Sequence, residues 1–244
     1  MKIVAVIEAR MTSTRLPGKV LLPANGKPLL QHLVERLKRV KSLDRIVLAT
    51  TVNAADDALD KFSKAQDIAC FRGSEEDVMA RVIGAAGSVA ADVIVSITGD
   101  CPVIDPILVE QLIQMYLYNP CDYASNRQIP TYPEGMDIQV YPLAALRRSA
   151  ALTDDPLDHE HVTLHIRNHP ELFRHLYLIA PQDQFWPELH LSLDESADYQ
   201  FLKTLIEHFG DANPYFSCPE IIEVLRAKPE WLVINAHVVL KGDK

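Results

Sequence analysis

Short apolar runs alternate with longer amphipathic segments along the first half of the chain. Four runs are typical of parallel strands with both faces buried: residues 3–7, 45–50, 68–71 and 93–97. Helical spacing of apolar positions separates them, at residues 29–40, 54–65 and 75–90. Asp105 and Pro106 then begin another helix, because Asp is a good N-cap and Pro suits the first helical position. This alternation predicts an α/β fold, a three-layer α/β/α sandwich with a mostly parallel sheet.

The second half of the chain is less regular. A loop is expected at residues 128–135, strands at 136–141, 176–179, 189–193 and 233–240, and helices at 157–168, 197–209 and 219–227. Repeats, low-complexity segments and an obvious linker are absent from the sequence. We therefore interpret residues 1–244 as a single domain, in which residues 122–184 form a small α+β insertion that covers one side of the site.

Composition narrows the class of protein. With 244 residues, of which 48% are hydrophobic, the chain can bury a sizeable core. A net charge of −9 argues against a nucleic-acid-binding surface. The first apolar run is too short for a signal peptide, and no apolar stretch is long enough to cross a membrane, so a cytoplasmic protein is expected. The four cysteines form no CxxC pair and are expected to be reduced and mostly packed as small apolar groups.

Cationic and hydroxyl side chains are concentrated directly after the first run, in residues 9–19. Three cations, Arg10, Arg15 and Lys19, accompany Ser13, and a Pro-Gly pair prevents a plain helix. Ligands of open α/β sheets bind outside the carboxyl ends of the strands. Arg offers a planar fork and Lys a point charge to phosphate oxygens, so this loop predicts a polyphosphate site rather than a solvated surface loop.

The spacing of this loop, Ala-Arg-x-x-Ser-x-Arg-x-x-Gly-Lys, resembles the N-terminal signature of the cytidylyltransferase family. That family includes CMP-Kdo and CMP-sialic acid synthetases, and the chain is most similar to its SpsF branch of spore coat polysaccharide proteins. Separate blocks along nearly the whole chain share the resemblance. It implies a fold like that of nucleotide-diphospho-sugar transferases, transfer of a nucleotidyl group from CTP to a sugar acid with release of pyrophosphate, and a homodimer. Within the loop it implies that Ala9, Arg10, Ser13, Arg15 and Lys19 bind the nucleotide, the three cations being catalytic.

Two aspartates follow predicted strands. Asp100 lies in the turn Thr-Gly-Asp-Cys-Pro and Asp194 ends the segment Leu-Ser-Leu-Asp. From the residues alone each can equally be a turn-forming or capping residue. The resemblance implies that both hold Mg²⁺, whose preferred ligands are hard oxygens, and that Asp100 is catalytic. Asp198 is expected to stabilise the start of the following helix.

Further positions come from the same resemblance. Arg72 and Ser74, after the third strand, are expected to hold the base or the ribose, although Ser74 also fits as a helix cap. Asp137, Glu160 and His161 are expected to line the acceptor sugar site.

His161, His165 and His169 are spaced to share one face of a predicted helix. This spacing is not the HExxH pattern of zinc proteases, and such a stripe is more often a solvated or interface surface than a zinc site.

Three alternatives remain open at this point. The base is not fixed by the residues, so a GTP- or UTP-dependent sugar 1-phosphate nucleotidyltransferase is one. A glycosyltransferase using a nucleotide-sugar is the second, although a loop dense in Arg and Lys favours a free triphosphate. A non-catalytic nucleotide-binding regulator is the third, although it would be expected to lack one of the two metal carboxylates.

Overall fold

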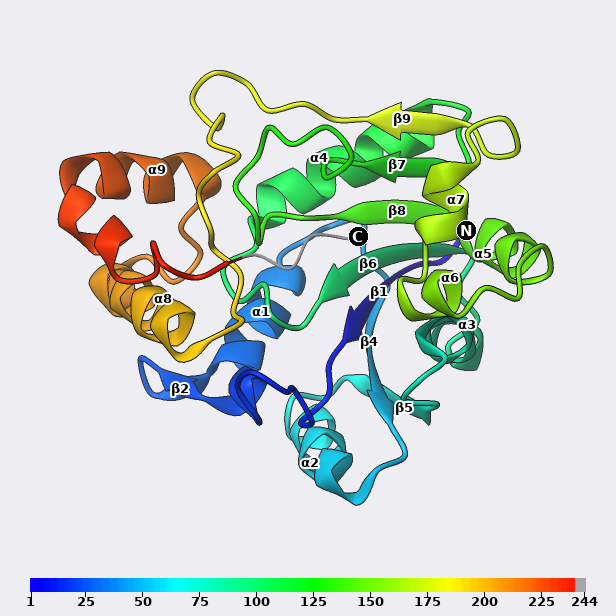
Figure 1. Cartoon of the computed structure of the whole chain (residues 1–244), viewed down its shortest axis with the longest axis horizontal. Coiled ribbons are helices and arrows are strands. Elements are labelled where there is room, and N and C mark those ends of the chain that lie inside the picture. Colours follow the sequence, from blue (N-terminus) through cyan, green and yellow to red (C-terminus); the bar gives the residue numbers. More distant parts are fainter. Residues whose placement is uncertain (240–244) are drawn as a thin grey trace.

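The computed structural model describes residues 1–239 and contains a seven-stranded sheet with helices on both faces (Figure 1). The strand order is β5-β4-β1-β6-β8-β7-β9. The strands are β1 (Ile3–Glu8), β4 (Arg45–Thr51), β5 (Ala69–Gly73), β6 (Val93–Thr98), β7 (Tyr123–Ser125), β8 (Gln139–Pro142) and β9 (His175–Tyr177), and a separate small hairpin joins β2 (Pro23–Ala24) to β3 (Lys27–Pro28). Only β8 runs against the other strands of this sheet. The predicted mostly parallel sandwich is confirmed.

Two hydrophobic cores separate the helices into two layers. One core packs α1 (Leu29–Leu37), α2 (Asp57–Ala65), α4 (Pro106–Tyr118), α8 (Ser196–Phe209) and α9 (Cys218–Ala227) against the sheet. The other packs α3 (Val78–Ser88), α5 (Leu143–Ala150) and α7 (Leu164–Asn168) against the opposite face. Alternate residues of β1 feed the two cores, as expected for a strand with both faces buried: Ile3 and Ala5 point to the first, and Val4 and Val6 to the second.

The order of the parallel strands reverses beside β1. From β1 the chain moves outward to β4 and β5, and it then returns to place β6 on the other side of β1. Open α/β sheets bind ligands at such a reversal, outside the carboxyl ends of the strands. The loop after β1 and the turn after β6 are therefore the segments placed to form a site.

Residues 122–184 extend the central sheet by β7, β8 and β9 and add α5, α6 (Pro156–Glu160) and α7. The α5 helix and the short β7 strand were not predicted. No helix within residues 1–239 is both long enough and apolar enough to span a membrane.

Several predicted boundaries are wrong. The helix expected at 157–168 is divided into α6 and α7, because Val162 adopts a positive φ of 49°. Residues 189–193 contribute only an isolated bridge between Glu134 and His190. Residues 233–239 form no strand, since a 3₁₀ helix over Pro229–Val233 leads into turns, and Leu240 lies outside the described residues. The helix expected from residue 75 starts at Val78.

Candidate active site

Two backbone contacts shape the loop after β1. The Gly18 N–H donates to the Met11 carbonyl at 2.9 Å, which closes the loop on itself. Gly18 has a φ of 70°, a left-handed conformation that glycine adopts without a steric penalty. The Met11 N–H donates to the Asp56 carboxylate at 2.7 Å, and this ties the loop to the segment after β4. The loop is thus closed between Met11 and Gly18 and anchored to the rest of the fold at Met11.

Each of the three loop cations contacts a carboxylate. Arg10 Nη1 lies 3.1 Å from Glu75 Oε1, and both side chains are partly exposed. Arg15 Nη2 lies 2.6 Å from Asp194 Oδ1. Lys19 Nζ lies 3.3 Å from Asp100 Oδ2 and 3.1 Å from Asp194 Oδ1. The cations are therefore already neutralised by acids of the same site.

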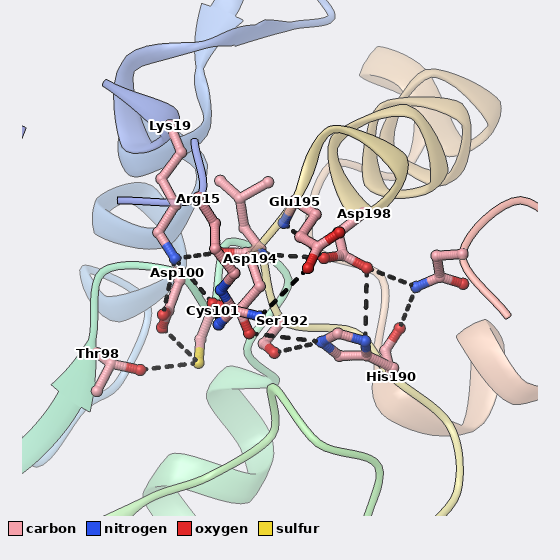
Figure 2. A network of polar contacts seen from close by, with 12 residues as sticks. Arg15, Lys19, Thr98, Asp100, Cys101, His190, Ser192, Asp194, Glu195 and Asp198 are labelled. Atoms are coloured by element: carbon pink, nitrogen blue, oxygen red, sulfur yellow. Dashed lines mark hydrogen bonds and ion pairs between the residues drawn. The ribbon is translucent and has the colours of Figure 1, made fainter. Parts of the chain in front are cut away.

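Close backbone approaches bring Asp100 and Asp194 together (Figure 2). Gly99 donates its N–H to the Glu8 carbonyl at 2.8 Å, and a Cβ at Gly99 would lie 2.8 Å from the Ala9 Cβ. Only glycine fits there, so the turn after β6 packs directly on the start of the cationic loop. On its other side, the Leu193 N–H donates to the Asp100 carbonyl at 2.8 Å. Both aspartates thereby face Lys19.

The buried carboxylate of Asp198 holds the backbone of Asp194 in position. Asp198 accepts hydrogen bonds from the backbone N–H groups of Asp194 and Glu195, at 3.1 and 2.8 Å, and shares a capping box with Glu195 at the start of α8. The expectation that Asp198 stabilises this helix start is confirmed. Asn235 from the C-terminal segment donates to Asp198 Oδ1 at 3.0 Å, and His190 Nδ1 lies 3.4 Å from the same oxygen (Figure 2). Burial lowers the pKa of His190, although these carboxylates oppose the shift.

A cleft of about 880 Å³ opens over these groups. Its lining combines the cationic loop, both aspartates, the start of α3 and the end of α6: Glu8, Ala9, Arg10, Ser13, Thr14, Arg15, Lys19, Val20, Glu75, Glu76, Val78, Arg81, Thr98, Asp100, Pro156, Glu160, His161 and Asp194. Nine predicted site residues meet in this one space, from Ala9 in the loop to His161 beyond α6. Its volume lies within the range of small-molecule binding sites.

Three predicted site residues are not among those lining the cleft. The guanidinium of Arg72 is engaged with the Thr51 and Asn53 carbonyls, at 2.9 and 2.7 Å, and with Asp57 at 2.6 Å. Ser74 accepts a hydrogen bond from the Asp77 N–H at 3.0 Å, and Asp77 is the N-cap of α3. In the structure these two residues order the segments after β4 and β5. Their nucleotide-binding role, like the sugar-binding role of Asp137, stays a prediction.

Some cleft residues were not selected from the sequence. Glu8 accepts a hydrogen bond from Ser96 at 3.0 Å, and burial raises its pKa, while Ser96 and the Arg81 charge oppose the shift. Arg81 donates to the Ser74 and Glu75 carbonyls. It is the one charged residue in the α3 sequence, so a lone cation on an apolar helix was the available signal.

The histidine stripe does not form. Because the helix is interrupted at Val162, His161 lies before α7 and His169 follows the last residue of α7. The His165 and His169 rings lie 4.4 Å apart between centroids, and His169 Nδ1 contacts Glu171 at 2.7 Å. Within the described part of the chain, no group of three His, Cys, Asp or Glu side chains is arranged to bind a metal.

Gly135 fixes the loop that carries Glu134 and Asp137. It has a φ of 94°, and a Cβ there would lie 2.6 Å from the Leu191 carbonyl carbon. Glycine is thus required here because the backbone of residues 191–192 approaches so closely. Burial, with a contribution from the Asp137 charge, raises the pKa of Glu134 to about 7.

Gly135→Ala is expected to destabilise the protein by about 2 kcal/mol or more, because it combines backbone strain with a clash. The melting temperature should fall by roughly 4–8 °C. Gly26→Ala is the matched control, since Gly26 also has a positive φ, of 74°, but has no atom within 4 Å of the added Cβ. Equal losses in the two variants would show that the clash at residue 135 contributes nothing.

His159 joins α6 to the start of α3. Its Nδ1 lies 3.0 Å from Asp77 Oδ1 and its Nε2 lies 3.2 Å from the Thr153 carbonyl, and these two contacts raise its pKa above the ordinary 6.5. The stabilisation is fully present below the unfolded pKa and is lost as pH rises through the folded pKa. We expect wild type to melt above His159→Gln at about pH 5.5 by no more than about 4 °C, and the two to converge at about pH 9. A difference that grows with pH would contradict this sign.

Comparison with known proteins decides which α/β nucleotide site this is. The family model described as "Cytidylyltransferase" matches residues 4–211. The chain belongs to the cytidylyltransferase family. The match begins in β1 and continues beyond α8, so it includes the cationic loop and both aspartates.

Individual relatives agree with this assignment. The chain is 38% identical over 232 residues to the spore coat polysaccharide biosynthesis protein SpsF of Bacillus subtilis, covering 93% of this chain and 95% of that protein. A cytidylyltransferase structure from Leptospira borgpetersenii superposes with a TM-score of 0.91 at 32% identity, over 99% of this chain and 100% of that one. An 8-amino-3,8-dideoxy-manno-octulosonate cytidylyltransferase from Shewanella frigidimarina is 37% identical over 50% of this chain and 51% of its own length.

Proposed function

We propose that this cytidylyltransferase transfers CMP from CTP to a sugar acid, releases pyrophosphate and supplies an activated sugar for surface polysaccharide or glycan synthesis. The observation that carries the proposal is the convergence of Arg15 and Lys19 on Asp100 and Asp194 at the strand reversal. Such a site combines cations for a triphosphate with carboxylates for a divalent cation. Its relatives are named for polysaccharide synthesis and for cytidylyl transfer to an eight-carbon sugar acid.

The cations would act through charge and position. Arg10, Arg15 and Lys19 lie on one loop, so they can contact different phosphates of a single triphosphate and stabilise charge as pyrophosphate departs. Ser13 and the backbone N–H groups of the loop would add hydrogen bonds. The sugar oxygen would attack from the α6 side of the cleft, which Glu160 and His161 line. Catalysis in this arrangement depends on orientation and electrostatics.

The two aspartates fit Mg²⁺. Their carboxylates offer hard oxygens, and the Lys19 ammonium that contacts both of them supports a cation site in this space. Two protein ligands leave most of the coordination sphere to phosphate oxygens and water, as Mg²⁺ usually requires. When bound, Mg²⁺ would neutralise the triphosphate and polarise the α-phosphate.

A ligand-binding panel tests the nucleotide. Thermal melting would be followed with CTP, GTP, ATP and UTP, each with and without Mg²⁺, because a ligand that binds only the folded state raises the melting temperature. We expect the largest shift with CTP and Mg²⁺. A shift with GTP or UTP instead would overturn the choice of CTP and direct the search to sugar 1-phosphates.

Pyrophosphate release then tests the acceptor. Sugar acids, amino-substituted sugar acids and hexose 1-phosphates would be compared at a fixed CTP concentration. Release that depends on a sugar acid supports the proposal, whereas stimulation only by a hexose 1-phosphate contradicts it. The homodimer and the cytoplasmic location stay predictions, and light scattering checks the first of them.

A further inference from the structure

Lys19 makes a complete set of contacts in the cleft. Its ammonium group contacts Asp100 Oδ2 at 3.3 Å, Asp194 Oδ1 at 3.1 Å and the Leu193 carbonyl oxygen (Figure 2). An ammonium has three protons, and three oxygens accept them here. Only 11% of the side chain is exposed. In this conformation Lys19 has no donor left for a phosphate.

The position of this ammonium is also the position that a divalent cation would need. The carboxylates that would hold Mg²⁺, those of Asp100 and Asp194, are the same two that the ammonium joins. The two cations would then repel at close range in a partly buried space. Lys19 and the metal therefore exclude each other from this position.

Arg15 also contacts Asp194, but it has no contact with Asp100 in the structure. It contacts Asp194 Oδ1, which is the oxygen that also contacts Lys19, whereas its second contact is with Glu195 at 3.7 Å. Among the residues that the structure describes, Lys19 alone contacts both aspartates. Its departure would leave Asp100 and Asp194 facing one another without the charge that links them.

We propose that Lys19 is an internal counter-cation of the metal site, and that it makes metal binding conditional on the nucleotide. Without nucleotide, Lys19 links Asp100 to Asp194 and keeps a free divalent cation out. A bound triphosphate offers Lys19 several phosphate oxygens, so the ammonium moves to them and the aspartates become available to the cation. The inference rests on the proposed function, since it assigns the triphosphate and the metal to this cleft.

The proposal predicts strong coupling between the two ligands. Binding of the nucleotide should raise the affinity for the metal, and by linkage the metal should raise the affinity for the nucleotide by the same factor. A purely structural Lys19 would give a different result, because its replacement would lower stability and leave the metal affinity unchanged.

Mn²⁺ binding measures the effect directly. Mn²⁺ would be titrated into wild type and Lys19→Met, without nucleotide and with an α,β-methylene analogue of CTP, and free Mn²⁺ would be followed by electron paramagnetic resonance. Without nucleotide we expect Lys19→Met to bind Mn²⁺ about tenfold more tightly than wild type. Lys27→Met is the matched control, because Lys27 pairs with Glu35 at 2.7 Å and is not among the residues that line the cleft. Its Mn²⁺ affinity should equal that of wild type.

A neutral substitution also makes a prediction about stability. Lys19→Gln keeps a donor for the Leu193 carbonyl but removes the charge. Lys19→Met and Lys19→Gln should both melt below wild type in the presence of a chelator, and Mn²⁺ should restore them, whereas wild type should respond little to Mn²⁺ alone. This measurement remains decisive if a variant is only partly folded.

The outcomes separate the inference from the proposed function. If the neutral variants bind Mn²⁺ no better than wild type and gain no stability from it, the counter-cation role is overturned. If the neutral variants gain Mn²⁺ affinity but the CTP analogue leaves the wild-type affinity unchanged, the choice of CTP fails, and the nucleotide-dependent half of the inference fails with it.

Discussion

Asp100→Asn is expected to lower the rate of pyrophosphate release by about a thousandfold or more. Asp100 lies just after β6, and its carboxylate is one of the two that contact Lys19. An amide keeps the shape of the side chain but removes the negative charge that a divalent cation needs. Loss of about 4 kcal/mol of transition-state stabilisation corresponds to about three factors of ten in rate. The rate would be measured with saturating CTP, acceptor and Mg²⁺.

Two comparisons make this result specific. Asp60→Asn removes a carboxylate from α2, where it contacts Lys64 at 2.6 Å, and should retain nearly full activity. The melting temperature of Asp100→Asn should stay within a few degrees of wild type, since the turn is held by backbone contacts of Gly99 and Leu193. Turnover near the wild-type rate would refute the metal-binding role of Asp100.

Asp56→Ala is expected to cause a large loss of stability although Asp56 is not among the residues that line the cleft. Asp56 is fully buried, and its carboxylate accepts hydrogen bonds from the Met11 N–H, the Thr51 N–H and the Thr51 hydroxyl. Alanine would leave these buried donors without an acceptor, at a cost of about 3 kcal/mol or more. The melting temperature should fall by roughly 6–12 °C.

The same variant should also weaken nucleotide binding. The hydrogen bond from Met11 to Asp56 is 2.7 Å long and joins the cationic loop to the end of β4, so its loss frees one side of the loop. Binding of the CTP analogue by calorimetry would measure this effect at a temperature where the variant is folded. Asp57→Ala is the neighbouring control, because that carboxylate is 58% exposed and exposed ion pairs such as the one with Arg72 contribute little to stability. Equal effects of the two substitutions would contradict the anchoring role of Asp56.

The case of Asp56 shows how sequence interpretation falls short. Both Asp56 and Asp57 fit the first turn of a helix, where negative charge suits the helix dipole. Only Asp57 remains there as an exposed residue, whereas Asp56 turns inward to Met11, 45 positions earlier. Local sequence cannot distinguish two adjacent aspartates of which one has a distant partner.

The spacing of apolar residues also predicted elements that the structure does not contain. The alternation in residues 233–239 is typical of a strand, but in the structure Val233 ends a 3₁₀ helix and residues 234–237 form a turn near α8. The Asn235 side chain donates a hydrogen bond to Asp198, which a strand pattern does not predict. Likewise, the helical pattern of 157–168 cannot reveal that Val162 breaks it. An alternating or helical pattern becomes an element only where the fold provides a surface for it.

By itself the sequence determined the α/β class, the first four parallel strands and the cationic loop after β1. These features follow from local patterns, namely buried apolar runs and charges concentrated within a few positions. Only the tertiary structure decided that Lys19 lies between Asp100 and Asp194, because the contact with Asp194 joins residues 175 positions apart. The reason is geometric: the strand reversal beside β1 brings distant loops to one edge of the sheet, and no local pattern records which side chains meet there.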